Sequence, residues 1–130
     1  MNKVSPDDQK RENVTPYDLL GEAGVRAVVD RFYDIMDTDP AAATIRAMHG
    51  ADLGPMRQKL FQFLSGWLGG PRLYNSCVMS AHRPFAIGAE ERDEWLMCMR
   101  RALEDTDASP QVKKMLERPL FAIADAFCNR

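Results

Sequence analysis

The sequence predicts an all-α fold. Apolar residues recur at steps of three and four along most of the chain, which is the spacing of one face of a helix. Strand signals are almost absent, since the β-branched residues mostly lie within this helical spacing. At 130 residues the chain has the length of one domain with a sizeable core. We therefore expect a single helical domain over residues 15–130, preceded by a flexible, polar tail over residues 1–14.

Two helices are expected before residue 38. Thr15 is a favourable N-cap and Pro16 suits the first helical position, so a short helix is expected to begin there and to end near Gly21. A longer helix follows from about residue 22 to residue 37. Its apolar residues form one stripe, which consists of Val25, Val28, Val29, Phe32, Tyr33 and Met36.

The next two segments lie between residues 39 and 68. Asp39 and Pro40 predict a short, alanine-rich stretch of helix that reaches His49 and ends at Gly50. Asp52 is the predicted cap of a long helix over about 52–68, which the sequence Gly-Gly-Pro then terminates. One face of this helix is apolar and contains Leu53, Met56, Leu60, Phe63, Leu64 and Trp67.

The remaining helices lie beyond residues 71–88, where the periodicity is weak and predicts little more than one helical turn before His82. A helix over about 89–105 is acidic at its start and basic later, as the helix dipole favours. A last helix is expected to begin at Ser109 and to extend through Phe127, with Pro119 kinking or breaking it.

Composition and charge exclude several classes of protein. The formal net charge of −2 gives no electrostatic basis for binding nucleic acid or an anionic membrane. No apolar run approaches the roughly 20 residues that a membrane span needs, and residues 1–13 lack the apolar segment of a secretory signal. The three cysteines, Cys77, Cys98 and Cys128, have no CxxC spacing, which favours a reducing cytoplasm over a disulfide framework or a zinc site.

His82 is the most informative residue of a chain that has only two histidines. Pro84 restricts Arg83 to extended geometry, so His82 is expected at the end of a helix. A histidine fixed there, between two long amphipathic helices, has the chemistry of an axial ligand for haem iron. The same position is also typical of a surface or capping histidine, and spacing alone leaves both interpretations open.

Six stretches of the sequence together indicate a family. They read YDLLG at 17–21, VDRFYD at 29–34, IRAMH at 45–49, FLSGWLGGP at 63–71, HRPFAIG at 82–88 and WLMCMRRAL at 95–103. In their order and spacing they resemble the group II truncated haemoglobins, over nearly all of residues 16–128. The resemblance implies a truncated globin fold, a two-over-two sandwich of antiparallel helix pairs with haem b and its iron between them.

The resemblance also implies roles for particular residues. His82 matches the proximal iron ligand, and Tyr33 and Trp95 match the hydrogen-bonding residues of the distal pocket. The other residues that it assigns to the haem pocket are His49, Met56, Leu60, Phe63, Leu64 and Phe85. Without the resemblance, a tyrosine on an apolar stripe is usually a core residue, and a histidine before a glycine is typical of a helix end.

The chain departs from the family in the segment before His82. This segment is several residues shorter than in group II members, and it lacks the arginines that would pair with the haem propionates. Its asparagine and serine residues favour turns, so we expect less regular structure over residues 72–81 than in the long helices. The basic residues that flank the haem-binding helices become the candidates for propionate contacts: Arg57, Lys59, Arg72 and Arg83.

The resemblance implies a protein that binds O₂, NO, CO or peroxide as small ligands. Two hydrogen bonds to a bound ligand would slow its release, which suits redox work such as NO dioxygenation or peroxide chemistry better than transport. Such an enzyme needs an electron donor, and the sequence has no flavin or nicotinamide motif, so a separate donor is expected. The alternative is a haem-free helical interaction module descended from globins. The sequence leaves the oligomeric state open.

Overall fold

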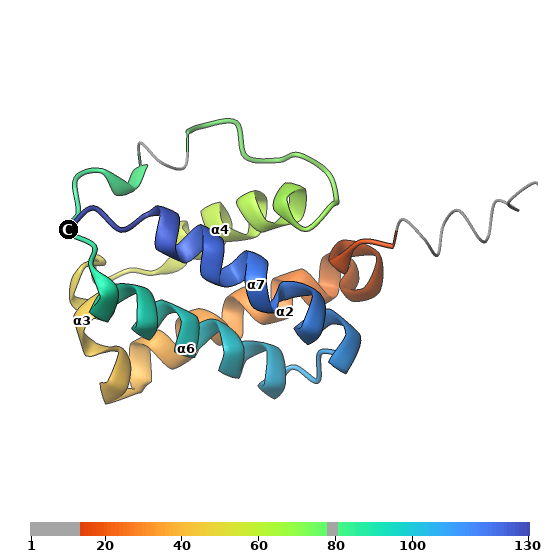
Figure 1. Cartoon of the computed structure of the whole chain (residues 1–130), viewed down its shortest axis with the longest axis horizontal. Coiled ribbons are helices and arrows are strands. Elements are labelled where there is room, and N and C mark those ends of the chain that lie inside the picture. Colours follow the sequence, from red (N-terminus) through yellow and green to blue (C-terminus); the bar gives the residue numbers. More distant parts are fainter. Residues whose placement is uncertain (1–13, 78–80) are drawn as a thin grey trace, which may run out of the picture.

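Helices account for all the regular structure of the residues that the computed structural model describes, which are 14–77 and 81–130 (Figure 1). Five are α-helices and one is a 3₁₀ helix: α2 (Pro16–Thr38), η1 (Pro40–Ala42), α3 (Ala43–Ala47), α4 (Gly54–Trp67), α6 (Ala89–Asp105) and α7 (Pro110–Ala126). No strand occurs within these residues, so the predicted all-α fold is confirmed. The predicted tail, apart from Val14, lies outside the described residues.

Helix α2 begins with a reciprocal cap. The Thr15 hydroxyl accepts a hydrogen bond from the Asp18 backbone N–H at 3.0 Å, and the Asp18 carboxylate accepts one from the Thr15 N–H at 3.1 Å. Gly21 interrupts the helix with φ 71° and ψ 172°, a conformation that glycine adopts without a steric penalty. The two helices expected before residue 38 are therefore contiguous, and the boundary expected near Gly21 is a kink.

The two segments that follow begin later, or end earlier, than the sequence predicted. Asp39 accepts a hydrogen bond from Ala41 N at 2.8 Å and so starts η1, but α3 ends at Ala47, before His49. Helix α4 begins at Gly54 instead of Asp52. Asp52 still caps the turn, because its carboxylate accepts a hydrogen bond from Gly54 N at 2.9 Å.

The last two helices follow the prediction except at one proline. Helix α6 has the predicted bounds, and α7 begins after Ser109, whose hydroxyl accepts a hydrogen bond from Val112 N at 3.2 Å. The expected interruption at Pro119 is wrong, because α7 continues through it. Pro119 is exposed and removes only one backbone donor from a helix that buries its opposite face.

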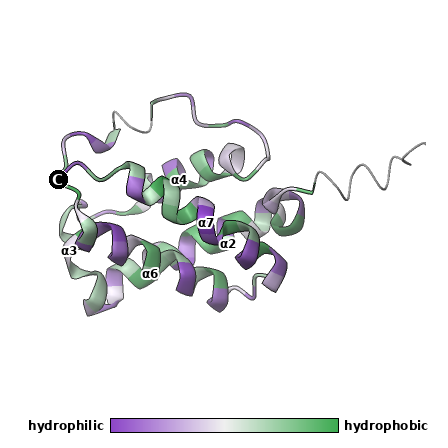
Figure 2. Cartoon of the chain, in the orientation of Figure 1, coloured by the Kyte–Doolittle hydropathy of each residue, from purple (hydrophilic) through white to green (hydrophobic). Residues whose placement is uncertain are grey.

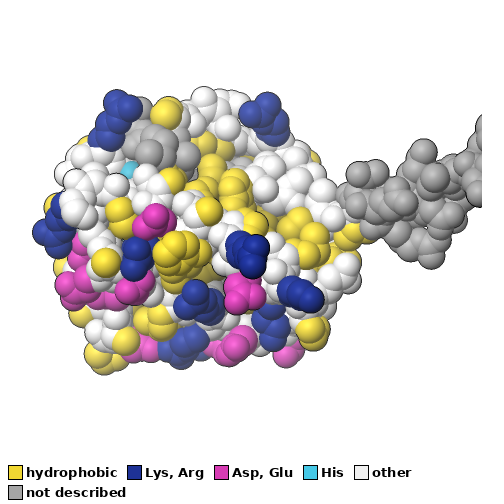
Figure 3. Space-filling view, in the orientation of Figure 1, with side chains coloured by type: hydrophobic (Ala, Val, Ile, Leu, Met, Phe, Trp, Pro, Cys, Tyr) yellow, Lys and Arg dark blue, Asp and Glu magenta, His cyan; other side chains and the backbone are white. Residues whose placement is uncertain are grey.

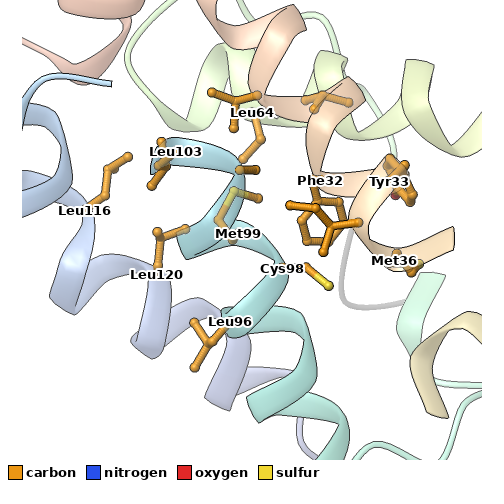
Figure 4. Packing of buried hydrophobic residues seen from close by; sticks show 14 of the residues in the cluster. Phe32, Tyr33, Met36, Leu64, Leu96, Cys98, Met99, Leu103, Leu116 and Leu120 are labelled. Atoms are coloured by element: carbon orange, nitrogen blue, oxygen red, sulfur yellow. The ribbon is translucent and has the colours of Figure 1, made fainter. Parts of the chain in front are cut away.

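The core forms where the four long helices meet. Helix α2 packs against both α4 and α6, and α6 packs against α7. Figure 4 shows side chains of α2 meeting those of α6, with leucines of α7 beside them. Val25, Val29, Phe32 and Cys98 are completely buried there. Hydrophobic residues follow the inner sides of the helices and hydrophilic residues the outer sides (Figure 2).

The turn after α4 is hydrogen-bonded to the start of α2 and to the last turns of α4. Tyr17 N donates a hydrogen bond to Leu68 O at 3.0 Å, and the buried Ser65 hydroxyl donates one to Pro71 O at 2.7 Å. Gly69 has φ +104°, and a Cβ at this position would lie 2.6 Å from the Thr15 side chain. Glycine is therefore required here both by the backbone and by the close approach of α2.

We expect Gly69→Ala to lower the free energy of unfolding by about 1–3 kcal/mol, because alanine is strained at positive φ and its Cβ would displace Thr15. Urea denaturation followed by circular dichroism measures the change. Gly50→Ala is the matched control, since a Cβ at Gly50 meets nothing within 4 Å. Equal stability of the two variants would contradict the prediction.

Candidate functional site

A cavity of about 410 Å³ opens between the helices. Cofactor-binding clefts commonly have volumes of about 300–1,000 Å³, so the space suits a small organic group. The walls are mostly apolar, and α2, α3, α4, α6 and α7 all contribute to them. Eight of the nine residues assigned to the site from the sequence line this one cavity: Tyr33, His49, Met56, Leu60, Phe63, His82, Phe85 and Trp95.

Leu64 is the ninth, and the structure does not place it in the cavity wall. It is 4% exposed and belongs to the hydrophobic core, beside a small void that Met99 and Leu120 also line. Successive residues of an α-helix point about 100° apart, so Phe63 and Leu64 cannot both face the cavity. The apolar stripe of α4 therefore serves two purposes, with one edge in the core and the other in the cavity.

Tyr33 and Trp95 bring two hydrogen-bond donors to the cavity from different helices. The Phe32 ring lies between them, 4.9 Å from the Tyr33 ring and 5.5 Å from the Trp95 ring, with edge-on contacts to both. Tyr33 is 3% exposed, whereas Trp95 is half-buried. Within residues 14–77 and 81–130, neither the Tyr33 hydroxyl nor the Trp95 indole N–H has a protein hydrogen-bond partner. No buried side-chain nitrogen or oxygen atom of these residues lacks a partner, so both donor atoms are open to the cavity and available to a bound group.

Burial raises the pKa of the Tyr33 phenol well above its usual value, and the nearby Arg57 guanidinium opposes only part of this shift. Tyr33 is therefore a neutral O–H donor at neutral pH. Arg57 lies 5.9 Å from the centre of the Tyr33 ring. It donates hydrogen bonds to the Asp30 carbonyl and to the Asp34 carboxylate, each at 2.8 Å, and so joins α4 to α2 at the level of Tyr33.

His82 lies in a short stretch of helical residues that precedes a turn, as Pro84 predicted. Its ring stacks on Phe127, with ring centres 4.1 Å apart and planes 11° apart. Residues 71–77 before it form neither helix nor strand, as expected, and residues 78–80 lie outside the described residues. The cavity therefore has an imidazole on a wall that α7 supports.

His49 approaches the cavity from the turn that follows α3. Its Nδ1 lies 2.7 Å from the Ile45 carbonyl oxygen, and because a carbonyl only accepts, Nδ1 carries the proton. The ring of His49 also meets the Tyr33 ring edge-on at 6.1 Å. His49 is thus held against the same wall as Tyr33.

Among the described residues, two cationic side chains line the cavity, and only one of them was a candidate from the sequence. Lys59 is one of them, as expected, but the other is Arg92 of α6, and Arg57, Arg72 and Arg83 are not among the lining residues. Arg92 precedes Trp95 by three residues, so both lie on one face of α6, and this spacing could have identified it. It also pairs with Asp125 at 3.0 Å.

Sequence reasoning missed further parts of the wall. Tyr74, in the irregular segment after α4, meets Phe63 edge-on at 6.1 Å. Phe127 and the buried Glu91 also line the cavity. Tyr74 and Glu91 lie outside the apolar helix stripes, so periodicity offered no signal for them, whereas Phe127 was expected only as the end of the last helix.

The cavity fits haem. An apolar, aromatic space suits the porphyrin ring, and Lys59 and Arg92 suit its two propionates. Within the described part of the chain, no cluster of three or more His, Cys, Asp or Glu side chains could hold a metal ion by itself. The cavity instead offers the imidazoles of His82 and His49 beside two unpaired donors, and one imidazole is enough for a haem iron, since the porphyrin supplies ligands of its own.

Known proteins resemble the chain closely. The family model described as bacterial-like globin matches residues 15–129. A group 2 truncated haemoglobin of Bacillus subtilis is 31% identical over 106 residues, which cover 78% of each chain. The solved group II 2-on-2 haemoglobin of Agrobacterium tumefaciens is 40% identical with a TM-score of 0.84, covering 91% of this chain and 96% of its own. A solved truncated oxygen-avid haemoglobin of Bacillus subtilis is 30% identical with a TM-score of 0.81, covering 88% and 99%.

These likenesses confirm the two-over-two globin fold and the binding of haem and small gas ligands such as O₂. Within residues 14–77 and 81–130, no helix combines the length and apolar character that crossing a membrane requires. The chain belongs to the bacterial-like globin family, and within it to the group II truncated haemoglobins, whose cofactor is haem.

Proposed function

We propose that this globin serves redox work and not chiefly transport: it binds O₂ for the oxidation of NO to nitrate, or takes peroxide as the oxidant in place of O₂. His82 is the axial ligand in this proposal, and Tyr33 and Trp95 donate hydrogen bonds to the gas. Haem supplies an iron atom that can change oxidation state and that leaves one coordination position for a small ligand. The protein's own residues decide how long that ligand stays.

The observation that supports the proposal is the pair of unpaired donors in one cavity. A neutral phenol and an indole N–H reach the same space from α2 and α6, and Phe32 holds their rings apart. Each hydrogen bond to a buried ligand is worth about 1–1.5 kcal/mol. Two of them slow ligand release by tens of times to about a hundredfold. Slow release is a disadvantage in transport and an advantage when the ligand must wait for a second reactant.

The apolar wall contributes in a second way. Met56 and Leu60 of α4 cannot donate hydrogen bonds, and they line the space together with Met36 and Phe63. Such a wall excludes water, so the donors keep their full strength toward a gas ligand. The solved Bacillus subtilis relative is described as oxygen-avid, which agrees with this assignment.

Repeated turnover requires an electron donor. The sequence has no flavin or nicotinamide motif, so we propose that a separate donor reduces the iron. The haem-free interaction module receives no support from the cavity, because a globin that had lost its cofactor would be expected to fill the space with side chains, whereas about 410 Å³ remains open.

The experiment is to supply the ferrous, O₂-equilibrated protein with NO and a chemical reductant and to follow nitrate and NO consumption. We expect many equivalents of nitrate per haem, with O₂ release in the absence of NO much slower than NO consumption. Release of O₂ faster than its reaction with NO, together with no turnover of NO or peroxide, would favour a transport or storage protein.

A further inference from the structure

Residues 127–130, which follow α7, hold the segment after His82 in place through hydrogen bonds and an ion pair. Asn129 alone makes three hydrogen bonds to this segment. Its backbone N–H donates to Ile87 O at 2.8 Å, its side-chain oxygen accepts from Ile87 N at 2.8 Å, and its side-chain NH₂ donates to Phe85 O at 2.7 Å. One asparagine thus satisfies three backbone groups of a segment that has no helix or strand of its own. We call residues 127–130 the clasp.

Two neighbours of Asn129 in the clasp reach the start of α6. Arg130 pairs with Glu91 at 3.3 Å, and the Cys128 thiol approaches Gly88 O at 3.7 Å. Glu91 is 4% exposed, and its carboxylate also accepts a hydrogen bond from Gly88 N at 2.7 Å. Figure 1 shows the C-terminus beside the irregular segment that leads into α6. The clasp therefore spans the whole connection between His82 and α6.

Two routes lead from the clasp to the His82 ring. Through the backbone, Asn129 holds Phe85, and Phe85 N donates a hydrogen bond to His82 O at 3.1 Å. Through the side chain, Phe127 covers one face of the imidazole in an almost parallel stack at 4.1 Å. A stacked ring resists rotation about the Cβ–Cγ bond, because turning would lift it from the phenyl face. One short segment thus contacts His82 through both its backbone and its ring.

We propose that Phe127 and Asn129 are positioning residues for the axial ligand: they fix the His82 imidazole in the orientation in which it bonds the haem iron. This inference rests on the proposed role of His82. Residues that orient a metal ligand commonly change metal affinity by about 10–100-fold when they are replaced. Here the orienting contacts are a phenyl face and an asparagine that holds the backbone.

The test uses the haem-loaded protein and the variants Asn129→Ala and Phe127→Leu. We expect each to shift the iron–histidine stretching band in the resonance Raman spectrum of the ferrous form and to speed haem transfer to excess apomyoglobin by about tenfold. Phe127→Tyr keeps the stack and should restore the wild-type band. Asn129→Asp keeps the acceptor for Ile87 N but loses the donor to Phe85 O, so its effect should also appear in the band.

Phe121→Leu is the matched control. It is a control for the Raman band, since it removes a ring from α7, six residues before Phe127. Phe121 is 42% exposed and lies outside the cavity lining, with its ring 5.0 Å from the Arg92 guanidinium. Hydrophobic and charged side chains mix on the face of the protein that Figure 3 shows. An unchanged band and unchanged haem transfer in both Asn129→Ala and Phe127→Leu would overturn the positioning role. So would a shift of equal size in Phe121→Leu. Failure of the proposed ligand is recognised separately, because His82→Ala would then keep the wild-type band.

Discussion

Replacing His82 with alanine is expected to abolish the histidine-ligated haem spectrum and to weaken haem retention by more than about tenfold. The physical reason is that neither the other histidine nor the buried cysteine Cys98 is placed to replace the His82 imidazole as the iron ligand. The other histidine, His49, is hydrogen-bonded through Nδ1 to Ile45 beside Tyr33. Cys98 is fully buried in the core, and burial raises the pKa of its thiol to about 11, so it offers no thiolate at neutral pH.

Absorption spectra of the ferric, ferrous and CO-bound forms measure this effect, together with a haem titration. His49→Ala is the matched control, since it removes the other imidazole from the same cavity and should keep the histidine-ligated ferrous spectrum. Added imidazole should restore part of the spectrum of His82→Ala, because it can occupy the space that the side chain leaves. An unchanged ferrous spectrum of His82→Ala would assign the axial ligand to another residue.

The second large effect is expected in O₂ release. Tyr33→Phe and Trp95→Phe each remove one donor while keeping an aromatic ring in the wall, so each should speed O₂ dissociation by about tenfold. The double variant should reach tens of times to about a hundredfold, and its change should differ from the product of the two single changes. Such coupling is expected because both donors address one ligand.

Stopped-flow displacement of O₂ by CO measures these rates. Tyr17→Phe and Trp67→Phe are matched controls, since they make the same chemical changes at rings outside the cavity lining. Both controls should release O₂ at the wild-type rate. If Tyr33→Phe and Trp95→Phe also release O₂ at that rate, the two donors do not hold the ligand.

Helix α6 illustrates what could be predicted from the sequence. Its acidic start, its basic later turns and its apolar stripe all indicate the same helix, and the observed bounds are the predicted ones. Pro119 shows where such reasoning fails. The rule that proline breaks helices concerns an isolated helix, whereas α7 buries Val112, Leu116 and Leu120 against the core and keeps its course through the proline.

The site was less predictable than the helices. Apolar spacing marked Tyr33 and Trp95 as inward-facing, but spacing cannot distinguish a side chain in the core from one in a cavity wall, and the resemblance to a family supplied that distinction. Leu64 shows the limit of such spacing, since one residue along a helix is enough to turn a side chain from cavity to core. The contacts of Asn129 could not be predicted, because they join irregular segments 42 and 44 residues apart in the sequence.

The burial of Tyr33 has a consequence for the fold in alkali. Its phenol has an ordinary pKa of 10.0 when the chain is unfolded and a much higher one in the folded protein. As the pH rises past about 10, the unfolded chain therefore loses this proton first and becomes favoured, and the free energy of unfolding falls. The buried Cys98 thiol acts in the same direction from about pH 9, since its pKa rises from 9.0 to about 11 on folding. The burial that keeps Tyr33 neutral thus also makes this globin less stable in alkali.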